Sequence, residues 1–118
     1  MSYYDGFVAA VPTANRETYA RHAEEAWTNM FKAMGALSMV ETWGEDVPDG
    51  EVTSFPMAVQ KKDDESVVFS WVEWPDKATR DAAWAKMMEM GPGAMDDMPF
   101  DGKRMIYGGF APIVAVRA

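Results

Sequence analysis

Side chains able to carry out acid–base chemistry are few in this sequence and lie far apart. His22 is the only histidine, and the 118 residues include no cysteine. Glu41 and Glu73 are carboxylates within otherwise apolar segments, and Arg104 is the obvious cationic partner for them. A glutamate held in an apolar cleft has a raised pKa and can act as a general base. The same placement is also typical of a structural ion pair, so both interpretations of the two glutamates stay open.

His22 stands at the border of the apolar face of a predicted helix. It is interpreted either as an acid–base group or haem-type ligand facing a cleft between helix and sheet, or as a border residue whose ring reaches solvent. The sequence contains no G-x-S-x-G nucleophile motif, no G-x-G-x-x-G motif and no phosphate-binding loop. One histidine without cysteine supplies too few ligands for a zinc site. We therefore predict no metal site, and the sequence identifies no cofactor.

Large side chains suitable for lining a ligand pocket are abundant, with five tryptophans and eleven methionines. Aromatic rings and pliable methionines together suit a flat apolar ligand. Asn15, Trp71 and Tyr107 are the candidate residues for binding a ligand or cofactor. The aromatic residues fit an ordinary core or subunit interface equally well. The Gly108–Gly109 pair indicates a bulge or a close backbone approach.

The net charge of −8 argues against nucleic acid as a partner, because clustered lysine and arginine supply most phosphate binding. It argues against an anionic membrane surface for the same reason. The apolar runs are far shorter than the ~20 residues that a membrane helix needs. The N-terminus lacks the basic flank and apolar core of a signal peptide. We predict a bacterial-type cytoplasmic protein.

Apolar periodicity and turn residues predict one domain, residues 1–118, with the element order β-α-β-β-β-α-β. We expect Asn15 to cap the first helix and Gly35 to end it, and Asp76 to cap the second helix. Pro56 suits an edge or a bulge of the third strand. Residues 62–65 are expected to form a charged hairpin loop and 91–102 a longer loop. Strands are expected over 3–11, 36–47, 53–61, 66–74 and 104–116, and helices over 15–34 and 76–90.

This order of elements predicts an α+β fold, a ferredoxin-like antiparallel sheet with two helices on one face. If the second face of such a sheet met water, apolar and polar residues would alternate along each strand. The segments 67–69 and 113–116 are instead apolar on both faces. A second copy of the chain is the simplest cover, because a two-fold contact uses one patch twice. We therefore predict a homodimer.

The segment 98–110, MPFDGKRMIYGGF, is the most distinctive part of the chain. Together with the segments 4–8 and 67–71, it resembles the YbaA-like bacterial family, domain of unknown function 1428. The resemblance covers nearly the whole chain. It implies a ferredoxin-like fold of the dimeric α/β-barrel type, in which two sheets pack face to face. It implies no particular activity.

Two functions follow as expectations. The first is a cytoplasmic homodimer that binds a small apolar or aromatic molecule in a cleft between helices and sheet. The alternative, by analogy with the dimeric α/β-barrel superfamily, is a cofactor-independent monooxygenase-like or haem-degrading type of enzyme. An enzyme requires polar residues that converge in one cleft, whereas a binding protein requires only an enclosed apolar pocket. A third, weaker interpretation is an interaction protein that uses its acidic surface. The sequence alone does not decide among them.

Overall fold

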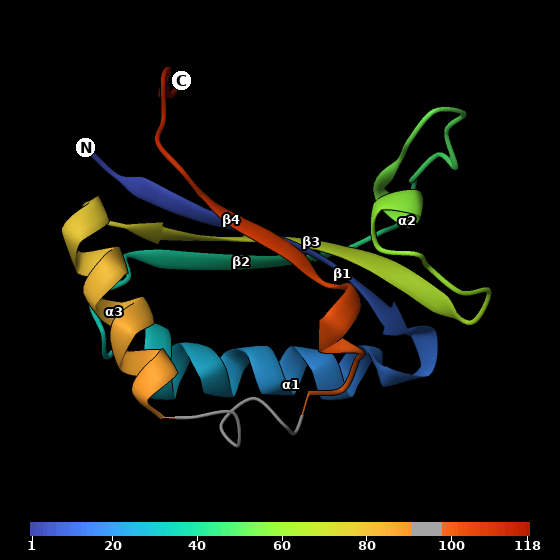
Figure 1. Ribbon diagram of the computed structural model, residues 1–118, viewed down its shortest axis with the longest axis horizontal. Coiled ribbons are helices and arrows are strands. Elements are labelled where there is room, and N and C mark those ends of the chain that lie inside the picture. The colour runs from blue at the N-terminus through green and yellow to red at the C-terminus, as the bar shows by residue number, and fades with distance from the viewer. Residues whose placement is uncertain (91–97) are drawn as a thin grey trace.

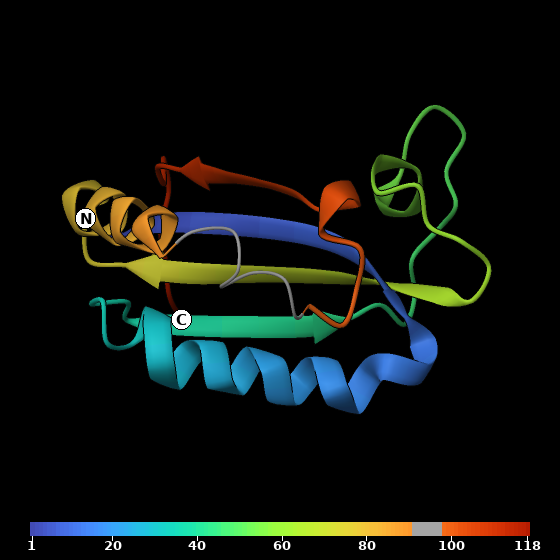
Figure 2. The same cartoon turned by 60° about the horizontal axis from the view of Figure 1, so that its bottom comes forward.

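The computed structural model describes residues 1–90 and 98–118, which form a four-stranded antiparallel sheet with helices (Figure 1). The strand order is β2-β3-β1-β4, and α1 and α3 lie on the same face of the sheet (Figures 1 and 2). This is the predicted ferredoxin-like α+β arrangement, which is thereby confirmed. Part of the predicted 91–102 loop, residues 91–97, lies outside the described residues. The strands are β1 (Tyr3–Pro12), β2 (Ser38–Trp43), β3 (Glu65–Trp74) and β4 (Ile106–Phe110), and the helices are α1 (Arg16–Ala26), α2 (Phe55–Ala58) and α3 (Lys77–Glu89).

The two central strands, β1 and β3, pair along their whole length, from Tyr3 opposite Trp74 to Pro12 opposite Glu65. Successive side chains of a strand point to opposite faces. Odd-numbered residues of β1 and even-numbered residues of β3 therefore share the face that α1 and α3 cover. The buried residues of that face form the main core: Ala9, Val11 and Val68 with Tyr19 of α1, and Val72 and Trp74 with Ala83 of α3.

Most of the segment predicted as the first helix, residues 15–34, is helical, but its last part is wider than an α-helix. α1 continues beyond Ala26 as a π-helical turn, Trp27–Phe31. Gly35 follows with a φ of +104°, a left-handed conformation that favours glycine. Asn15 stands at the cap position, but its side chain does not cap the helix. Its amide donates instead to the Pro99 carbonyl oxygen at 2.9 Å.

The predicted strand 53–61 is wrong, because a short helix, α2, occupies most of this segment. The Ser54 hydroxyl accepts a hydrogen bond from the Met57 backbone N–H at 3.1 Å, and Pro56 lies in the first turn. A proline there loses no helical hydrogen bond, because the first N–H groups of a helix have no partner within it. Apolar residues at every second position suggested a strand, but the serine cap and the proline favour a helix start.

The segment that follows α2 covers part of the second sheet face. Val59 is completely buried and packs against Val8, Ala10 and Val67. By the two-residue period, these strand residues point away from α1 and α3. A second copy of the chain is therefore not needed to cover this corner of the sheet. The rest of that face is open, and its exposed apolar residues are Val40, Phe69, Ile106 and Phe110.

Two strands are shorter than predicted. β2 ends at Trp43 rather than at residue 47, and β4 ends at Phe110 rather than at residue 116. The pairing of β4 with β1 ends just before Pro112, because proline has no N–H to donate to a neighbouring strand. The terminal segment 111–118 then leaves the sheet on the side opposite α1 and α3 (Figure 1). Its side chains Ile113, Val114 and Val116 are largely exposed.

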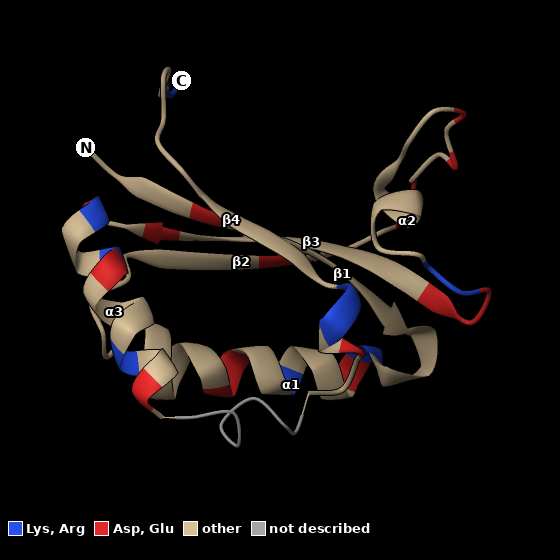
Figure 3. Cartoon of the chain, viewed as in Figure 1, with Lys and Arg blue, Asp and Glu red and all other residues tan. Residues whose placement is uncertain are grey.

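The second main helix agrees with its prediction. Asp76 caps α3, since its carboxylate accepts a hydrogen bond from the Thr79 backbone N–H at 2.7 Å. The lysines and arginines are spread over several elements rather than gathered on one face (Figure 3). None of the helices formed by the described residues is both long enough and apolar enough to traverse a lipid bilayer.

Gly109 of β4 shows the close approach predicted for the glycine pair, without a bulge. A Cβ atom there would lie 2.8 Å from the Arg80 Nη2 and Tyr3 Oη atoms. The pairing of β1 with β4 runs without interruption through Asp5 opposite Gly109 and Gly6 opposite Gly108. Gly109 thus leaves room for two side chains rather than for a change of register.

Gly109→Ala should therefore lower the free energy of unfolding by about 1–3 kcal/mol, the usual cost of overpacking. Gly108→Ala is the matched control, because its Cβ would meet only the Phe110 ring at an ordinary 3.5 Å. It should leave stability unchanged or raise it by up to about 1 kcal/mol. Urea unfolding of both variants at one protein concentration measures the difference. Equal stability of the two variants would show that Tyr3 and Arg80 move aside freely.

Candidate functional site

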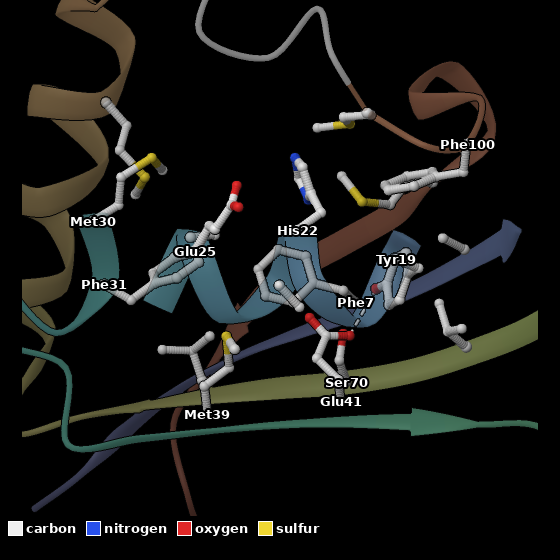
Figure 4. A pocket seen from close by; sticks show the side chains of 18 of the residues that line it. Phe7, Tyr19, His22, Glu25, Met30, Phe31, Met39, Glu41, Ser70 and Phe100 are labelled. Atoms are coloured by element: carbon white, nitrogen blue, oxygen red, sulfur yellow. Dashed lines mark hydrogen bonds between the residues drawn. The ribbon is translucent and has the colours of Figure 1, made fainter. Parts of the chain in front are cut away.

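A cavity of about 580 Å³ lies between the sheet and the helices α1 and α3 (Figure 4). We call it the helix–sheet cavity. Most of its wall is apolar, and methionine and phenylalanine side chains come from the sheet, from both helices and from the segment ahead of β4. Ligand pockets of proteins typically have ~300–1,000 Å³ and this kind of lining. The sheet-facing side of α1 and the helix-facing side of the sheet therefore do not fill the space between them.

The strand pairing places two polar side chains side by side on the floor of this cavity. Glu41 of β2 lies opposite Ser70 of β3 in the register, so the two point to the same face. Residues at helical spacing on α1, among them Tyr19, His22 and Ala26, line the wall above them. Figure 4 shows His22 pointing into the cavity from α1, and Glu41 and Ser70 pointing into it from the sheet.

Tyr19 and Glu41 form the polar centre of the cavity. The Tyr19 hydroxyl donates to the Glu41 Oε1 atom at 2.7 Å. Solvent reaches Glu41 through the open cavity, but protein surrounds the carboxylate, and this loss of hydration raises its pKa. Hydrogen bonds from Tyr19 and Ser70 and the nearby His22 oppose that rise. Burial and the Glu41 charge raise the pKa of the Tyr19 phenol, so Tyr19 remains a hydrogen-bond donor.

The π-helical turn forms one end of the cavity. Three successive residues, Asn29, Met30 and Phe31, all line it. In a regular α-helix three successive side chains spread over more than half of the circumference, so they would not share one wall. Wide turns of this kind often occur at functional sites. The turn therefore gives the cavity an amide and two large apolar groups from one short segment.

The distinctive segment ahead of β4 forms the other end of the cavity. Met98, Phe100 and Met105 line it. Asn15 holds this segment to the start of α1 through its bond to Pro99, and the Asp101 carboxylate accepts from the Lys103 backbone N–H at 3.0 Å. The sequence motif therefore has a structural role, which is to form one end of the cavity.

Arg104 anchors the same segment. It was expected to pair with Glu41 or Glu73, but it pairs with neither. Its guanidinium donates to both carboxylate oxygens of Glu65, at 2.7 and 2.6 Å, and to Asp101 at 3.0 Å. This pairing lowers the pKa of Glu65 to about 2. Glu65 was expected in a charged hairpin loop, but it begins β3 and is buried. The arginine thus serves the fold at a position that does not line the helix–sheet cavity.

Glu73 and Trp71 lie on the sheet face opposite the cavity. The Glu73 carboxylate accepts from the hydroxyls of Ser2 at 2.6 Å and Ser38 at 3.2 Å, and these bonds lower its pKa. The Trp71 ring packs against Phe69 with a centroid distance of 5.5 Å. The structure therefore separates these two candidates from His22 and Glu41, which share the cavity.

Tyr107 and Asn15 are also absent from the cavity lining. The Tyr107 ring stacks on Phe7 and Trp84, with centroid distances of 6.4 and 5.9 Å. Both of those partners line the cavity, so Tyr107 supports its wall from behind. Asn15, as described above, positions the segment around Pro99. Of the seven predicted site residues, His22 and Glu41 alone line the helix–sheet cavity.

A carboxylate that the sequence prediction missed fixes α3 to the sheet. Asp5 is 1% exposed and accepts from the indole N–H groups of Trp74 at 2.9 Å and Trp84 at 2.8 Å. Arg80 donates to it at 2.8 Å and lies over the rings of Tyr3 and Trp84. The available signal was an aspartate at an inward-facing position of an apolar strand, which requires donors around it. Asp5 thereby sets the position of Trp84 in the cavity wall.

The described residues contain no group of three acidic or histidine side chains placed to hold a metal ion. The cavity lining offers instead two carboxylates, two hydroxyls, an imidazole and an amide, set in an apolar wall. Such groups can orient a ligand by hydrogen bonds, and a carboxylate with a raised pKa can also accept a proton.

Comparison with known proteins places the chain in a family. It is 52% identical over 120 residues to the "Uncharacterized protein YbaA" of Escherichia coli strain K12, covering 97% of this chain and 98% of that protein, and the Shigella flexneri protein of the same name matches equally well. A crystal structure of a dimeric ferredoxin-like protein from an uncultured marine organism has a similar fold, with a TM-score of 0.57 and 13% identity over the whole of both chains. The model of the family "Protein of unknown function (DUF1428)" matches residues 2–102. The chain therefore belongs to the DUF1428 family.

Proposed function

We propose that this protein is a cytoplasmic homodimer that binds a small apolar or aromatic molecule in the helix–sheet cavity. The cavity itself carries the proposal, because its volume of about 580 Å³ suits a small molecule and its wall is mostly apolar. Methionines from several elements line it, including Met30, Met39 and Met105. Their flexible side chains can adapt to the shape of a ligand.

The open part of the second sheet face supports the homodimer. Val40, Phe69, Ile106 and Phe110 are each at least 37% exposed there. Several exposed apolar residues on one sheet face are typical of an interaction surface. The structural neighbour with a similar fold is described as dimeric. A two-fold axis would bring this patch against its own copy.

Filling the cavity should abolish ligand binding. Ala26 lines it, so Ala26→Trp would place an indole in the ligand space. Ala20→Trp is the matched control, because Ala20 is on the same helix and exposed. We expect the neutral dye Nile red to bind the natural protein and Ala20→Trp equally, and to bind Ala26→Trp at least tenfold more weakly. Fluorescence titration measures this. Equal binding by all three proteins would place the dye elsewhere and contradict the proposal.

An enzyme that uses Glu41 as a general base is the second candidate. The observation in its favour is the convergence of Glu41, Tyr19 and His22 in one cavity, with the pKa of Glu41 raised. In an enzyme of this kind, Glu41→Gln would abolish turnover and leave the affinity for the substrate nearly unchanged. In a pure binding protein the substitution would change affinity alone. Incubating a bound ligand with the protein and analysing it by mass spectrometry distinguishes the two.

A further inference from the structure

We propose that the ligand of the helix–sheet cavity carries a cationic amine on an aromatic or apolar frame, and that Glu41 is the counterion of this amine. The inference rests on the proposed binding function and specifies its ligand class. It is carried by the charges of the cavity wall and by the lack of an ion pair for Glu41 within the described part of the chain.

The charged groups that line the cavity are mostly negative. Glu25 contributes a carboxylate from α1 and Glu41 contributes one from the sheet (Figure 4). Among the described lining residues there is no lysine or arginine, and His22 is the one basic side chain. An anionic ligand would meet two like charges that repel it, whereas a cationic ligand would meet two opposite charges that attract it.

Glu41 forms no ion pair with the described part of the protein. None of the ion pairs within residues 1–90 and 98–118 includes it, and Arg104, its expected partner, binds Glu65 and Asp101. The nearby His22 lowers the pKa of Glu41 but does not pair with it. A carboxylate crowded by protein is costly unless a counterion and hydrogen-bond donors compensate for its lost hydration. The structure supplies a hydrogen-bond donor, Tyr19, but no paired lysine or arginine among the described residues. A ligand amine would supply the counterion.

The carboxylate is also positioned to receive such a group. The Tyr19 hydroxyl occupies one of its acceptor sites, and an ionised carboxylate has roughly four, so sites remain for an amine. This hydrogen bond holds the orientation of the Glu41 side chain. Phe7 lies two strands from Glu41 in the register, with Ser70 between them, and Phe31 and Phe100 stand towards the two ends of the cavity (Figure 4). These rings suit the aromatic frame of the ligand, while Glu41 binds its charged end.

Three probes with one aromatic frame test this inference: naphthylmethylamine, naphthylmethanol and naphthoate, which are cationic, neutral and anionic at neutral pH. Isothermal titration with the natural protein should show the amine binding about tenfold more tightly than the alcohol, as a charged hydrogen bond commonly achieves. The acid should bind most weakly. In Glu41→Gln the amine should bind no better than the alcohol, while the alcohol keeps its affinity. Glu24→Gln, which makes the same change of net charge at an exposed position of α1 outside the lining, should keep the natural order.

The outcomes separate this inference from the proposed function. If the three probes bind the natural protein with equal affinity, the charge preference is wrong and the binding function stands. If no probe binds, both proposals fail. Loss of the preference in Glu24→Gln as well would assign it to net charge rather than to Glu41. The order of the three probes in the natural protein needs no variant, so the test holds even if Glu41→Gln does not fold.

Discussion

Asp5→Ala is expected to lower the free energy of unfolding by about 3–5 kcal/mol, which is the usual result of removing one partner from a buried ion pair. Asp5 is 1% exposed, so water cannot replace its carboxylate. The substitution leaves the Arg80 guanidinium with the exposed Asp81 as its remaining carboxylate and deprives the indole N–H groups of Trp74 and Trp84 of their acceptor. A buried donor that has neither water nor an acceptor as a partner destabilises the folded state. The attachment of α3 to the sheet should weaken most.

Urea unfolding followed by tryptophan fluorescence measures this effect, at one protein concentration because association would shift the midpoint. Asp81→Ala is the control, since Asp81 also pairs with Arg80 but its side chain is 45% exposed. Exposed ion pairs contribute little, so this variant should unfold close to the natural protein. If the two variants unfold at the same urea concentration, Arg80 and the two tryptophans do not depend on Asp5, and our account of this cluster is wrong.

Phe69→Asp should weaken self-association of the chain by at least about a hundredfold, as expected when a charge must be buried in an apolar contact. Phe69 lies on the central strand β3 and is 44% exposed on the open sheet face. Its ring packs against Phe55 at 5.8 Å and Trp71 at 5.5 Å. In the single chain an aspartate could remain in water at this position. In the proposed homodimer it would face its own copy across the interface.

Sedimentation velocity at micromolar concentration provides the test. The natural protein should sediment as a dimer and Phe69→Asp as a monomer with an unchanged circular dichroism spectrum. Leu37→Asp is the control, because Leu37 is 56% exposed and its odd number places it on the face of Met39, which lines the cavity. It should remain dimeric. A natural protein that sediments as a monomer would refute the homodimer, and a dimeric Phe69→Asp would move the interface elsewhere.

Prediction of the elements succeeded where periodicity and end signals agreed. The apolar run of β3 lies where expected, and Asp76 caps α3 as predicted. Prediction failed where two local signals conflicted. Around Pro56 the apolar residues alternate as in a strand, but Ser54 caps a helix, and the buried Val59 holds that helix on the sheet. Contacts between distant segments decided the conflict, and these are not visible in the local sequence.

Two of the predicted site residues, His22 and Glu41, line the helix–sheet cavity, whereas the predicted partner of Glu41 was wrong. Arg104 was chosen because it was an obvious cation, but Glu65, 39 residues earlier in the chain, binds it. Which carboxylate meets an arginine depends on the path of the loops between them. Asp5 was missed for a related reason, since its donors come from β3 and α3. Sequence shows that a buried charge needs partners, but not which ones.

The sequence by itself determined the fold class and the family, because both follow from the order of the elements and from the motif at 98–110. Only the tertiary structure decided which glutamate enters the cavity. Glu41 lies opposite Ser70 in the strand pairing, whereas Glu73 lies opposite Ser38, so the two glutamates point to opposite faces. A shift of one residue in this pairing would reverse the relation. Packing on both faces of the finished sheet sets the register and prevents such a shift. No local sequence pattern contains this information.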